Sequence, residues 1–413
     1  MEHPAVRRKQ RDQDRCTALL LENIHPVAVD VLSQAGVDVR AAPGAMDEAE
    51  LVEAISDVDL LGIRSKTQVT AKVLEHAPRL LAIGAFCIGT NQIDLRTASS
   101  GGVTVFNAPF SNTRSVVELA IAEIIALTRR LTQKDAALHA GRWDKSAAGA
   151  HEVRGRRLGI VGYGNIGSQL SVLAESLGMS VSFYDVADKL ALGNARRRPT
   201  LEAVLEESDV VSLHVDGRPG NAGIFGEQQF RHMKPGAIFI NLSRGFVADH
   251  EALREHILSG HLSGAAIDVF PDEPKRQGDE FSSALRGLPN VILTPHIGGS
   301  TEEAQEDIGR FVAGKLEDFL HNGATTLSVN MPSVALEHAP GTHRLAHLHQ
   351  NVPGVLARVN AVLADRGVNI EGQQLTTLGD LGYLVTDIAL DYAPDVVDEL
   401  AGLPETVALR VID

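Results

Sequence analysis

The chain has 413 residues, of which 44% are apolar and 22% are charged, a composition typical of folded globular proteins. At roughly 150 residues per domain, this length predicts about three domains. The excess of 53 acidic over 38 basic residues gives a net charge of −15, which disfavours a general nucleic-acid-binding protein. No apolar run reaches the roughly 20 residues of a membrane span, so no membrane association is expected. Two cysteines, Cys16 and Cys87, are too few for a disulfide framework and predict a cytoplasmic protein.

The first part of the chain predicts a polar tail followed by a parallel sheet. Residues 1–16 carry no apolar period, so we expect a disordered tail, with a nucleic-acid-binding arm as the alternative. From residue 17 onward, short apolar runs alternate with helical stretches, which is the pattern of βαβ units. Strands are expected at residues 18–21, 58–63, 80–86 and 103–107, with a helix at 25–35.

A long helix over residues 113–131 precedes a second alternation of strands and helices. Its strands are expected at residues 156–161, 180–184, 210–215, 238–242, 265–269 and 291–294. Two sheets joined by one long helix predict two lobes. An amphipathic helix at 302–320 is expected to pack back on the first lobe. The substrate-binding domain would then comprise residues 17–112 and 296–330, and residues 113–295 would form the inserted domain.

The end of the chain predicts a third domain. Residues 331–342 contain prolines and glycine without helical period and are interpreted as a linker. Residues 343–413 show a β-α-β-β-α-β order, which is typical of a ferredoxin-like domain. Its strands are expected at 344–349, 368–376, 382–390 and 407–411, and its helices at 353–365 and 394–401.

A dinucleotide fingerprint opens the inserted domain. Gly162, Gly164 and Gly167 lie between an apolar strand and a helical stretch, and Asp185 ends the following strand. The glycines allow a tight turn and close approach of a pyrophosphate, and the helix N-terminus favours its charge. Asp185 is expected to hold the ribose hydroxyls and to repel a 2′-phosphate, which favours NAD over NADP. A purely structural glycine turn is the alternative.

Three reactive side chains each follow a strand of the same predicted sheet: Arg244, Glu273 and His296. Because the carboxyl ends of parallel strands meet at one edge, these residues are expected to converge on one cleft. A histidine can take the proton of a substrate hydroxyl, and a carboxylate beside it favours the charged imidazole. An arginine can hold a substrate carboxylate through two parallel hydrogen bonds. Taken singly, each could be a surface arginine, a loop acid or a capping histidine.

Together with segments 241–245, 265–274 and 293–300, these motifs resemble the D-isomer-specific 2-hydroxyacid dehydrogenases. Segments 82–94 and 106–116 and the C-terminal domain resemble the short bacterial members that oxidise 3-phospho-D-glycerate and carry an ACT domain. The resemblance implies an α/β fold, with a Rossmann-type domain inserted in a flavodoxin-like substrate-binding domain. It also implies oxidation of 3-phosphoglycerate to 3-phosphohydroxypyruvate as the first step of L-serine biosynthesis, feedback inhibition by L-serine, and a homotetramer.

The same resemblance implies roles for individual residues. His296 would be the acid and base, Glu273 its partner and Arg244 the carboxylate anchor. NAD contacts would come from Asn165, Ile166, Asp185, Leu242, Ser243, Arg244, Asp268, His296, Ile297, Gly298 and Gly299. Substrate contacts would come from Arg64, Ser65, Asn112 and Gln305, with Trp143 and Lys145 on an arm that reaches a neighbouring subunit. His349, Asn351 and Asn369 would bind serine between paired ACT domains.

A metal site is not expected, one loop departs from the family pattern, and two alternative functions remain open. His347 and His349 share a strand face, but further ligands at a suitable spacing are missing, so no metal site is expected. Residues 214–221 depart from the family pattern, with Asp216 where relatives usually have proline, which puts the shape of this cofactor loop in doubt. Another 2-hydroxyacid dehydrogenase or 2-oxoacid reductase, such as one acting on 2-oxoglutarate, is the first alternative function, and a non-catalytic NAD-sensing protein is the second.

Overall fold

The computed structural model describes residues 6–8, 16–274, 278–337, 341–393 and 395–412. It divides into two compact units, Met1–Pro109 with Gln305–Asp413, and Phe110–Ala304. The units therefore meet at 109/110 and 304/305, whereas the sequence predicts domain boundaries at 112/113 and 295/296. Because the second boundary lies later in the chain than expected, the loop that carries His296 belongs to the second unit.

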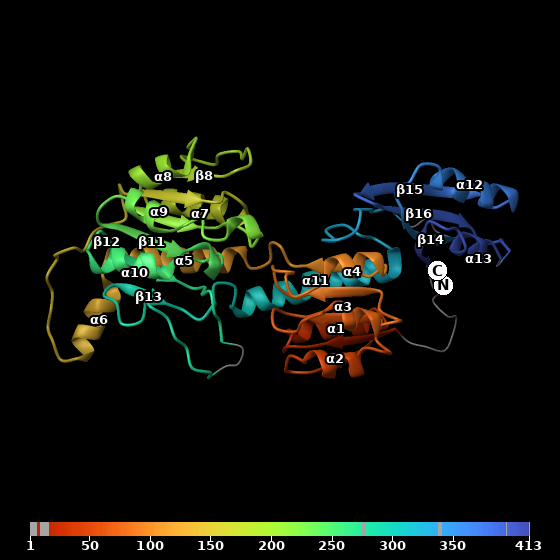
Figure 1. Cartoon of the computed structure of the whole chain (residues 1–413), viewed down its shortest axis with the longest axis horizontal. Coiled ribbons are helices and arrows are strands. Elements are labelled where there is room, and N and C mark those ends of the chain that lie inside the picture. Colours follow the sequence, from red (N-terminus) through yellow and green to blue (C-terminus); the bar gives the residue numbers. More distant parts are fainter. Residues whose placement is uncertain (1–5, 9–15, 275–277, 338–340, 394, 413) are drawn as a thin grey trace. The chain divides into compact units, whose positions relative to one another are not determined.

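The first unit begins with a five-stranded parallel sheet in the order β3-β2-β4-β5-β6 (Figure 1). Its strands are β2 Thr17–Leu20, β3 Asp38–Ala41, β4 Leu60–Ile63, β5 Ala82–Ala85 and β6 Thr104–Asn107. Its helices are α1 Pro26–Gln34, α2 Glu48–Ala54, α3 Ala71–Glu75 and α4 Leu95–Ser100. Strands β4 and β5 are buried throughout, as expected for parallel strands covered on both faces.

A helix from much later in the chain completes this domain. Helix α11, Glu302–Asn322, packs Val312 and Leu316 into the same core cluster as Leu20 and Phe106. The domain is therefore discontinuous in sequence.

The second unit is a seven-stranded parallel sheet in the order β13-β12-β11-β10-β7-β8-β9. Its strands are β7 Arg157–Val161, β8 Ser180–Tyr184, β9 Arg196–Arg197, β10 Val210–Leu213, β11 Ala237–Asn241, β12 Leu262–Ile267 and β13 Val291–Leu293. Helices α5 Thr113–Thr128 and α7 Asn165–Ser176 cover one face. The other face is covered by α8 Leu201–Glu207, α9 Glu227–His232 and α10 His250–Leu258. Helix α6, Leu131–His139, follows α5, and two 3₁₀ turns lie at Pro219–Asn221 and Gly245–Val247.

The C-terminal domain has the β-α-β-β-α-β order that the sequence predicts. Its antiparallel strands lie in the order β17-β14-β16-β15, at Thr406–Ile412, Thr342–Gln350, Leu381–Ala389 and Ile370–Leu378. Helices α12 Val355–Asp365 and α13 Asp395–Ala401 bury Val359 and Leu400 against one face of the sheet.

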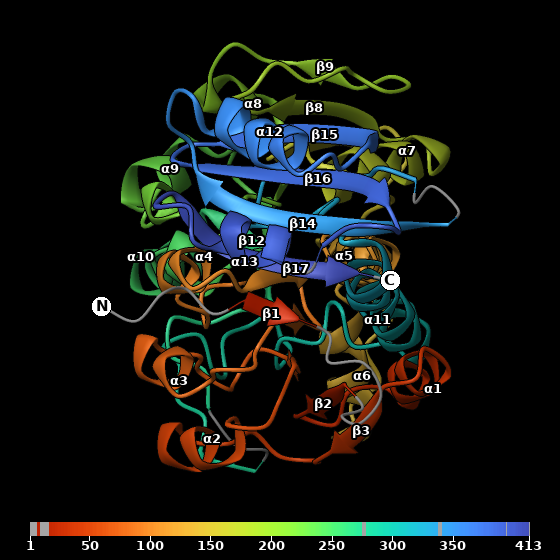
Figure 2. The same ribbon diagram turned by 90° about the vertical axis from the view of Figure 1, so that its right-hand side faces the viewer.

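One segment of the tail is ordered, which corrects the expectation of a fully disordered N-terminus. Residues Val6–Arg8 form strand β1, which runs parallel to β17 at the edge of this sheet (Figure 2). Without it, β17 would expose a row of unpaired backbone groups, which favours the addition of a strand. Residues 1–5 and 9–15 of the expected tail lie outside the described residues.

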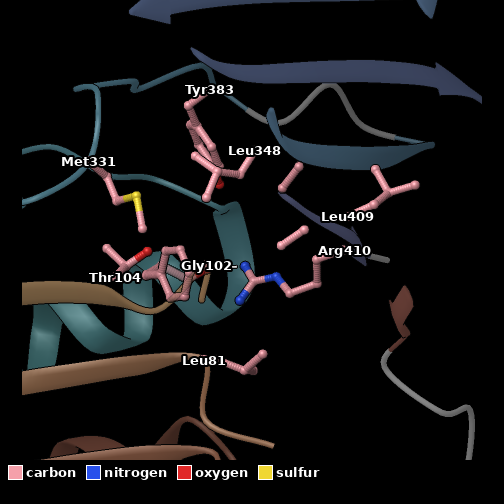
Figure 3. Close-up of a pocket in the computed structure, with 11 residues that line it drawn as sticks. Leu81, Gly102, Thr104, Met331, Leu348, Tyr383, Leu409 and Arg410 are labelled. Carbon is pink, nitrogen blue, oxygen red and sulfur yellow. Dashed lines mark hydrogen bonds between the residues drawn. The ribbon is translucent and has the colours of Figure 1, made fainter. Parts of the chain in front are cut away.

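Three side chains of the C-terminal domain hold the end of helix α11. The hydroxyl of Tyr383 donates to the carbonyl of Gly323 at 2.8 Å, and Arg344, paired with Asp387, donates to the carbonyl of Asn322 at 2.8 Å. Arg410 donates to carbonyls in the last turn of the helix, and its guanidinium carbon lies 4.3 Å from the centroid of the Phe319 ring. Figure 3 shows Tyr383 and Arg410 in this region. The last carbonyls of a helix lack intrahelical partners, so these contacts cap α11. A cavity of about 30 Å³ remains beside them.

Candidate active site

The glycine-rich turn between β7 and α7 has the geometry that a dinucleotide requires. Gly162 has φ of 92°, and a Cβ atom there would lie 2.6 Å from the carbonyl oxygen of His214. A Cβ atom at Gly167 would lie 2.3 Å from the carbonyl oxygen of Gly162. Among the described residues, no side chain caps α7 at Gly164, so its first amides are available to a phosphate. These residues fit NAD as their cofactor.

Asp185 lies against this turn. One carboxylate oxygen accepts a hydrogen bond from the backbone N–H of Tyr163 at 2.8 Å, and the other accepts from Ala187 at 2.8 Å. A carboxylate keeps further lone pairs when each oxygen accepts one bond. Asp185 can therefore still accept hydrogen bonds from the ribose hydroxyls.

We expect the substitution Asp185→Ala to shift the cofactor preference towards NADP, because the carboxylate no longer repels a 2′-phosphate. The ratio of kcat/KM for NAD to that for NADP should fall by about tenfold or more, the equivalent of roughly 1.4 kcal/mol. Steady-state kinetics with both cofactors measures this ratio. The exposed Asp188→Ala on the same loop is the matched control. An unchanged ratio in Asp185→Ala would refute the ribose assignment.

His296 and Glu273 form a hydrogen-bonded pair. His296 Nδ1 lies 2.9 Å from one carboxylate oxygen of Glu273 and 3.1 Å from the other. His296 has φ of 54°, a left-handed conformation that is uncommon outside glycine and often marks a functional site. The backbone N–H of Phe270 donates to Glu273 at 3.1 Å. The carboxylate is thus held from one side while it orients the imidazole, leaving Nε2 as the nitrogen for a substrate.

The pair has complementary pKa shifts. The hydrogen bond that His296 donates to the Glu273 carboxylate raises the pKa of His296 above 6.5, although burial and the positive charge of Arg244 oppose it. Burial alone would raise the pKa of Glu273, but the hydrogen bond and charge of His296, with Arg244, bring it below 4.5. The carboxylate therefore stays ionised near neutral pH and stabilises the imidazolium, as a proton-accepting histidine requires.

We expect oxidation to lose activity as the pH falls through the pKa of His296, since only the neutral imidazole accepts a proton. In Glu273→Gln that pKa should fall, because the amide carries no negative charge. The acid limb of the profile of kcat/KM against pH should therefore move to lower pH. If the acid limb lay at the same pH in wild type and variant, Glu273 would not be the group that raises the pKa of His296.

Arg244 is the third member of this site. It follows β11, and its guanidinium donates to the carbonyl of Ser243 at 2.7 Å. Its positive charge acts on the pKa of His296 and on that of Glu273. The structure thus brings the three predicted catalytic residues together at the carboxyl ends of their strands.

Asp268 organises the loop around His296. Its buried carboxylate accepts hydrogen bonds from the Thr294 hydroxyl at 2.6 Å and from the N–H groups of Ile297 and Gly298, both at 2.8 Å. The resemblance places Asp268 among the cofactor contacts, whereas in the structure these oxygens bind the protein. Asn241, which the sequence analysis missed, fixes the loop that carries Arg244. Its side-chain oxygen accepts hydrogen bonds from the backbone N–H of Ser243 at 3.1 Å and from the Ser243 hydroxyl at 2.7 Å.

Asn112 lies next to the same loop. A Cβ atom at Gly299 would lie 2.3 Å from its side-chain nitrogen. Its side-chain oxygen is buried and makes no hydrogen bond within the part of the chain that the structure describes. Trp143 is 78% exposed and lies with Lys145 on the segment after α6.

The loop after β4 carries Arg64 and Ser65 in the first unit. Glu22 holds it: its carboxylate accepts hydrogen bonds from the N–H groups of Arg64 at 3.2 Å, Lys66 at 3.0 Å and Thr67 at 2.8 Å. Glu22 itself is buried and has φ of 63°. The sequence analysis missed Glu22, because a carboxylate that binds backbone amides leaves no motif. Gln305 lies on α11 in the same unit.

The loop that departs from the family pattern is closed by its own side chains. Asp216 forms an ion pair with Arg218 and accepts a hydrogen bond from the Asn221 side chain at 2.9 Å. The hydrogen bond of Arg218 lowers the pKa of Asp216, and Arg244 adds to this effect. The loop borders the site, since a Cβ atom at Gly217 would lie 3.2 Å from Arg244 Nε. The departure therefore produces an ordered loop.

The expected effector residues lie in the C-terminal domain. His349 at the end of β14 is buried and bonds through Nδ1 to the carbonyl of Gln350 at 2.8 Å. Asn351 is exposed and donates to the carbonyl of Gly379 at 3.0 Å. Asn369 is exposed and donates to Glu371 at 2.6 Å. Each of the three side chains therefore bonds to a different neighbour within the chain.

A Rossmann-type domain with a glycine-rich turn, a ribose acid and a histidine–carboxylate pair beside an arginine defines an NAD-dependent dehydrogenase of hydroxy acids. Comparison with known proteins agrees. Residues 121–298 match the family model for the NAD-binding domain of D-isomer specific 2-hydroxyacid dehydrogenases, and residues 345–408 match an ACT domain of the AHAS small subunit type.

The chain is 49% identical to D-3-phosphoglycerate dehydrogenase of Haemophilus influenzae, over 97% of this chain and 98% of that protein. It is 47% identical to D-3-phosphoglycerate dehydrogenase 1 of Saccharomyces cerevisiae, over 94% of this chain and 85% of that protein. The chain belongs to the D-3-phosphoglycerate dehydrogenase family. Among solved structures, D-2-hydroxyisocaproate dehydrogenase matches with a TM-score of 0.69 and 28% identity, covering 76% of this chain and 99% of that one.

Proposed function

We propose that this protein oxidises 3-phospho-D-glycerate to 3-phosphohydroxypyruvate with NAD as the oxidant, the first step of L-serine biosynthesis. The observation that carries the proposal is the His296–Glu273 pair, 2.9 Å apart, beside Arg244 in a dinucleotide-binding domain. The family of full-length relatives supports the choice of substrate.

The protein residues divide the reaction between them. Arg244 holds the substrate carboxylate and thereby directs C2 towards the cofactor. His296 accepts the hydroxyl proton at Nε2 as the C2 hydrogen leaves as a hydride, and Glu273 stabilises the resulting imidazolium. NAD, when bound, supplies the nicotinamide carbon that accepts the hydride. In the reverse direction, the protonated His296 returns the proton to the carbonyl oxygen of the product.

The phosphate of the substrate requires its own cation. Arg64 and Ser65 follow β4 in a loop that Glu22 fixes by three hydrogen bonds, which supports their assignment to this role. Lys145 and Trp143 are proposed to complete the site of a neighbouring subunit, and Asn112 and Gln305 to contact the substrate.

Nicotinamide absorbance with NAD and a panel of hydroxy acids tests the proposal. We expect turnover of 3-phospho-D-glycerate with a kcat/KM at least about tenfold above those for D-lactate, D-glycerate and 2-hydroxyglutarate. Arg64→Met should remove most of this preference. The variant loses the contact with the phosphate of 3-phospho-D-glycerate, whereas D-glycerate has no phosphate for the guanidinium to bind. Faster turnover of 2-hydroxyglutarate would favour the 2-oxoacid reductase, and NAD binding without turnover of any acid would favour a sensor.

L-Serine is proposed as a feedback inhibitor that binds between ACT domains of two subunits. We expect Asn351→Ala to weaken inhibition by about tenfold while leaving uninhibited turnover unchanged, because one charge-assisted hydrogen bond to the amino acid is lost. Inhibition curves at saturating substrate measure this effect. Glu399→Ala on the exposed face of α13 is the matched control. Equal inhibition of Asn351→Ala and wild type would remove this residue from the effector site.

A homotetramer in the cytoplasm completes the proposal. Paired ACT domains and a subunit-crossing arm both require neighbouring copies, and light scattering would give their number. Of the helices in the described ranges, none is both long and apolar enough to cross a membrane.

A further inference from the structure

The second unit contains a cavity that the proposed reaction does not use. It encloses about 310 Å³, within the size range of sites for small ligands. Its lining includes Val210, Ile238 and Leu262, at or next to the first residues of β10, β11 and β12. The catalytic residues follow the other ends of the strands, so the sheet separates this cavity from the site around His296.

Two buried polar atoms in the lining lack partners. Thr128 at the end of α5 is 3% exposed and Asn290 before β13 is 4% exposed. Thr128 Oγ1 and Asn290 Oδ1 make no hydrogen bond to any residue that the structure describes. The amide orientation of Asn290 is set by its nitrogen, which donates to the carbonyl of Ser263 at 2.8 Å. Buried polar atoms are normally satisfied, so both oxygens point to a polar occupant.

Cationic side chains line the rest of the cavity. Arg130 and Arg156 both contribute, and His151 offers its imidazole. Arg130 Nε donates a hydrogen bond to the side-chain oxygen of Gln133 at 2.6 Å. Arg156 Nε donates one to the backbone carbonyl of Glu152 at 3.2 Å. Within the described residues, the terminal nitrogens of Arg130 make no hydrogen bond, and those of Arg156 have only the long ion pair to Asp209 described next.

The one carboxylate in the lining is already neutralised. Asp209 pairs with Lys234 at 2.5 Å and accepts a hydrogen bond from the backbone N–H of Arg157 at 2.9 Å. Arg156 lies farther from it, with 3.9 Å between Nη1 and Oδ1. The balance of charge in the cavity is therefore positive, in a protein whose net charge is −15.

We propose that this cavity binds a small anion that carries a hydroxyl group. The anionic end would lie at Arg130 and Arg156, which can bind a phosphate or a carboxylate through paired hydrogen bonds. The hydroxyl would donate to Asn290 Oδ1, and Thr128 Oγ1 can bond to either end. Hydroxylated monophosphates and hydroxycarboxylates share this chemistry. The inference is independent of the reaction proposed above, because it uses none of the residues of that site.

Calorimetric titration of the full-length protein with four probes tests the proposal. Glycerol 3-phosphate and D-glycerate carry the hydroxyl, and methyl phosphate and propionate are their counterparts without it. Titration in the presence of saturating 3-phospho-D-glycerate and NADH keeps the probes out of the catalytic site. We expect each hydroxylated probe to bind more tightly than its counterpart, and the tighter of the two to identify the anionic group.

Variants assign the binding to this cavity. Arg130→Met should weaken binding about tenfold or more, the loss of one charged hydrogen bond, and the isosteric Thr128→Val should weaken it several-fold. Arg154→Met, two residues before Arg156 with a 79% exposed side chain, should leave affinity unchanged. Thermal unfolding confirms that each variant is folded.

Three results would overturn the proposal: no binding of any probe at millimolar concentration, equal binding by Arg130→Met and wild type, or no advantage of the hydroxylated probes. A change in oligomeric mass of Arg130→Met without anion binding by the wild type would instead identify the cavity as part of a subunit interface.

Discussion

Replacing His296 by alanine is expected to lower kcat about 10³-fold, with little change in the affinity for NAD. A positioned general acid–base group contributes typically about 10²–10⁴-fold to rate, and His296 is the group whose free nitrogen faces the site once Glu273 holds the other at 2.9 Å. Absorbance kinetics measures the loss in both directions of the reaction. The loss should be equal in the two directions, because His296 accepts the proton during oxidation and returns the same proton during reduction. The dissociation constant of NADH, measured by fluorescence, should remain within about twofold, less than 0.5 kcal/mol.

Two controls separate chemistry from folding in this experiment. Glu273→Gln should lose less activity than His296→Ala, since the amide still accepts a hydrogen bond from Nδ1. His76→Ala, an exposed histidine of the first unit, should retain full turnover. Near-wild-type kcat in His296→Ala would mean that another base takes the proton, and the assignment of the site would be wrong.

The second large effect concerns stability. Glu123 on α5 is 3% exposed, and both of its carboxylate oxygens are without hydrogen-bond partners in the described structure. Burial, with a smaller contribution from the charge of Asp268, raises the pKa of Glu123 from 4.5 to about 8. The folded protein therefore holds a proton that the unfolded chain releases. The free energy of unfolding should fall as the pH rises from about 4.5 to 8.

We expect Glu123→Gln to remove this dependence, because the amide is neutral at every pH and similar in shape. The variant should be more stable than wild type at pH 8 by on the order of 3 kcal/mol and similar to it at pH 5. Denaturant unfolding at the two pH values measures the difference. Glu118→Gln on the same helix, where Glu118 is 59% exposed, is the matched control. A parallel loss of stability in wild type and Glu123→Gln would show that Glu123 is ionised in the fold.

Strands that are buried on both faces were predictable from the sequence, and exposed ones were not. Strand β8 lies at Ser180–Tyr184, where its apolar residues predict it. Strand β3, Asp38–Ala41, was missed because it is an exposed edge strand whose polar residues carry no apolar signal. Strand β1 was missed for a related reason, because it depends on pairing with β17 rather than on its own composition.

The catalytic residues of the site were predictable because the sequence contains the complete set of motifs. The residues that support them were not predictable. Arg244, Glu273 and His296 each stand at a strand end, so topology brings them together. Glu22, Asn241 and Asp268 act by accepting hydrogen bonds from backbone amides. Such contacts join residues far apart in sequence and have no fixed spacing, so only the structure reveals them.

The capped end of α11 has a mechanical consequence. Arg344, Tyr383 and Arg410 hold the last turn of a continuous 21-residue helix, which is about 31 Å long. Its first residue, Glu302, follows His296 closely along the chain. Since a hydrogen-bonded helix resists stretching and bending, these three side chains tie the ACT domain to the same stiff element that packs Val312 and Leu316 into the core of the first sheet.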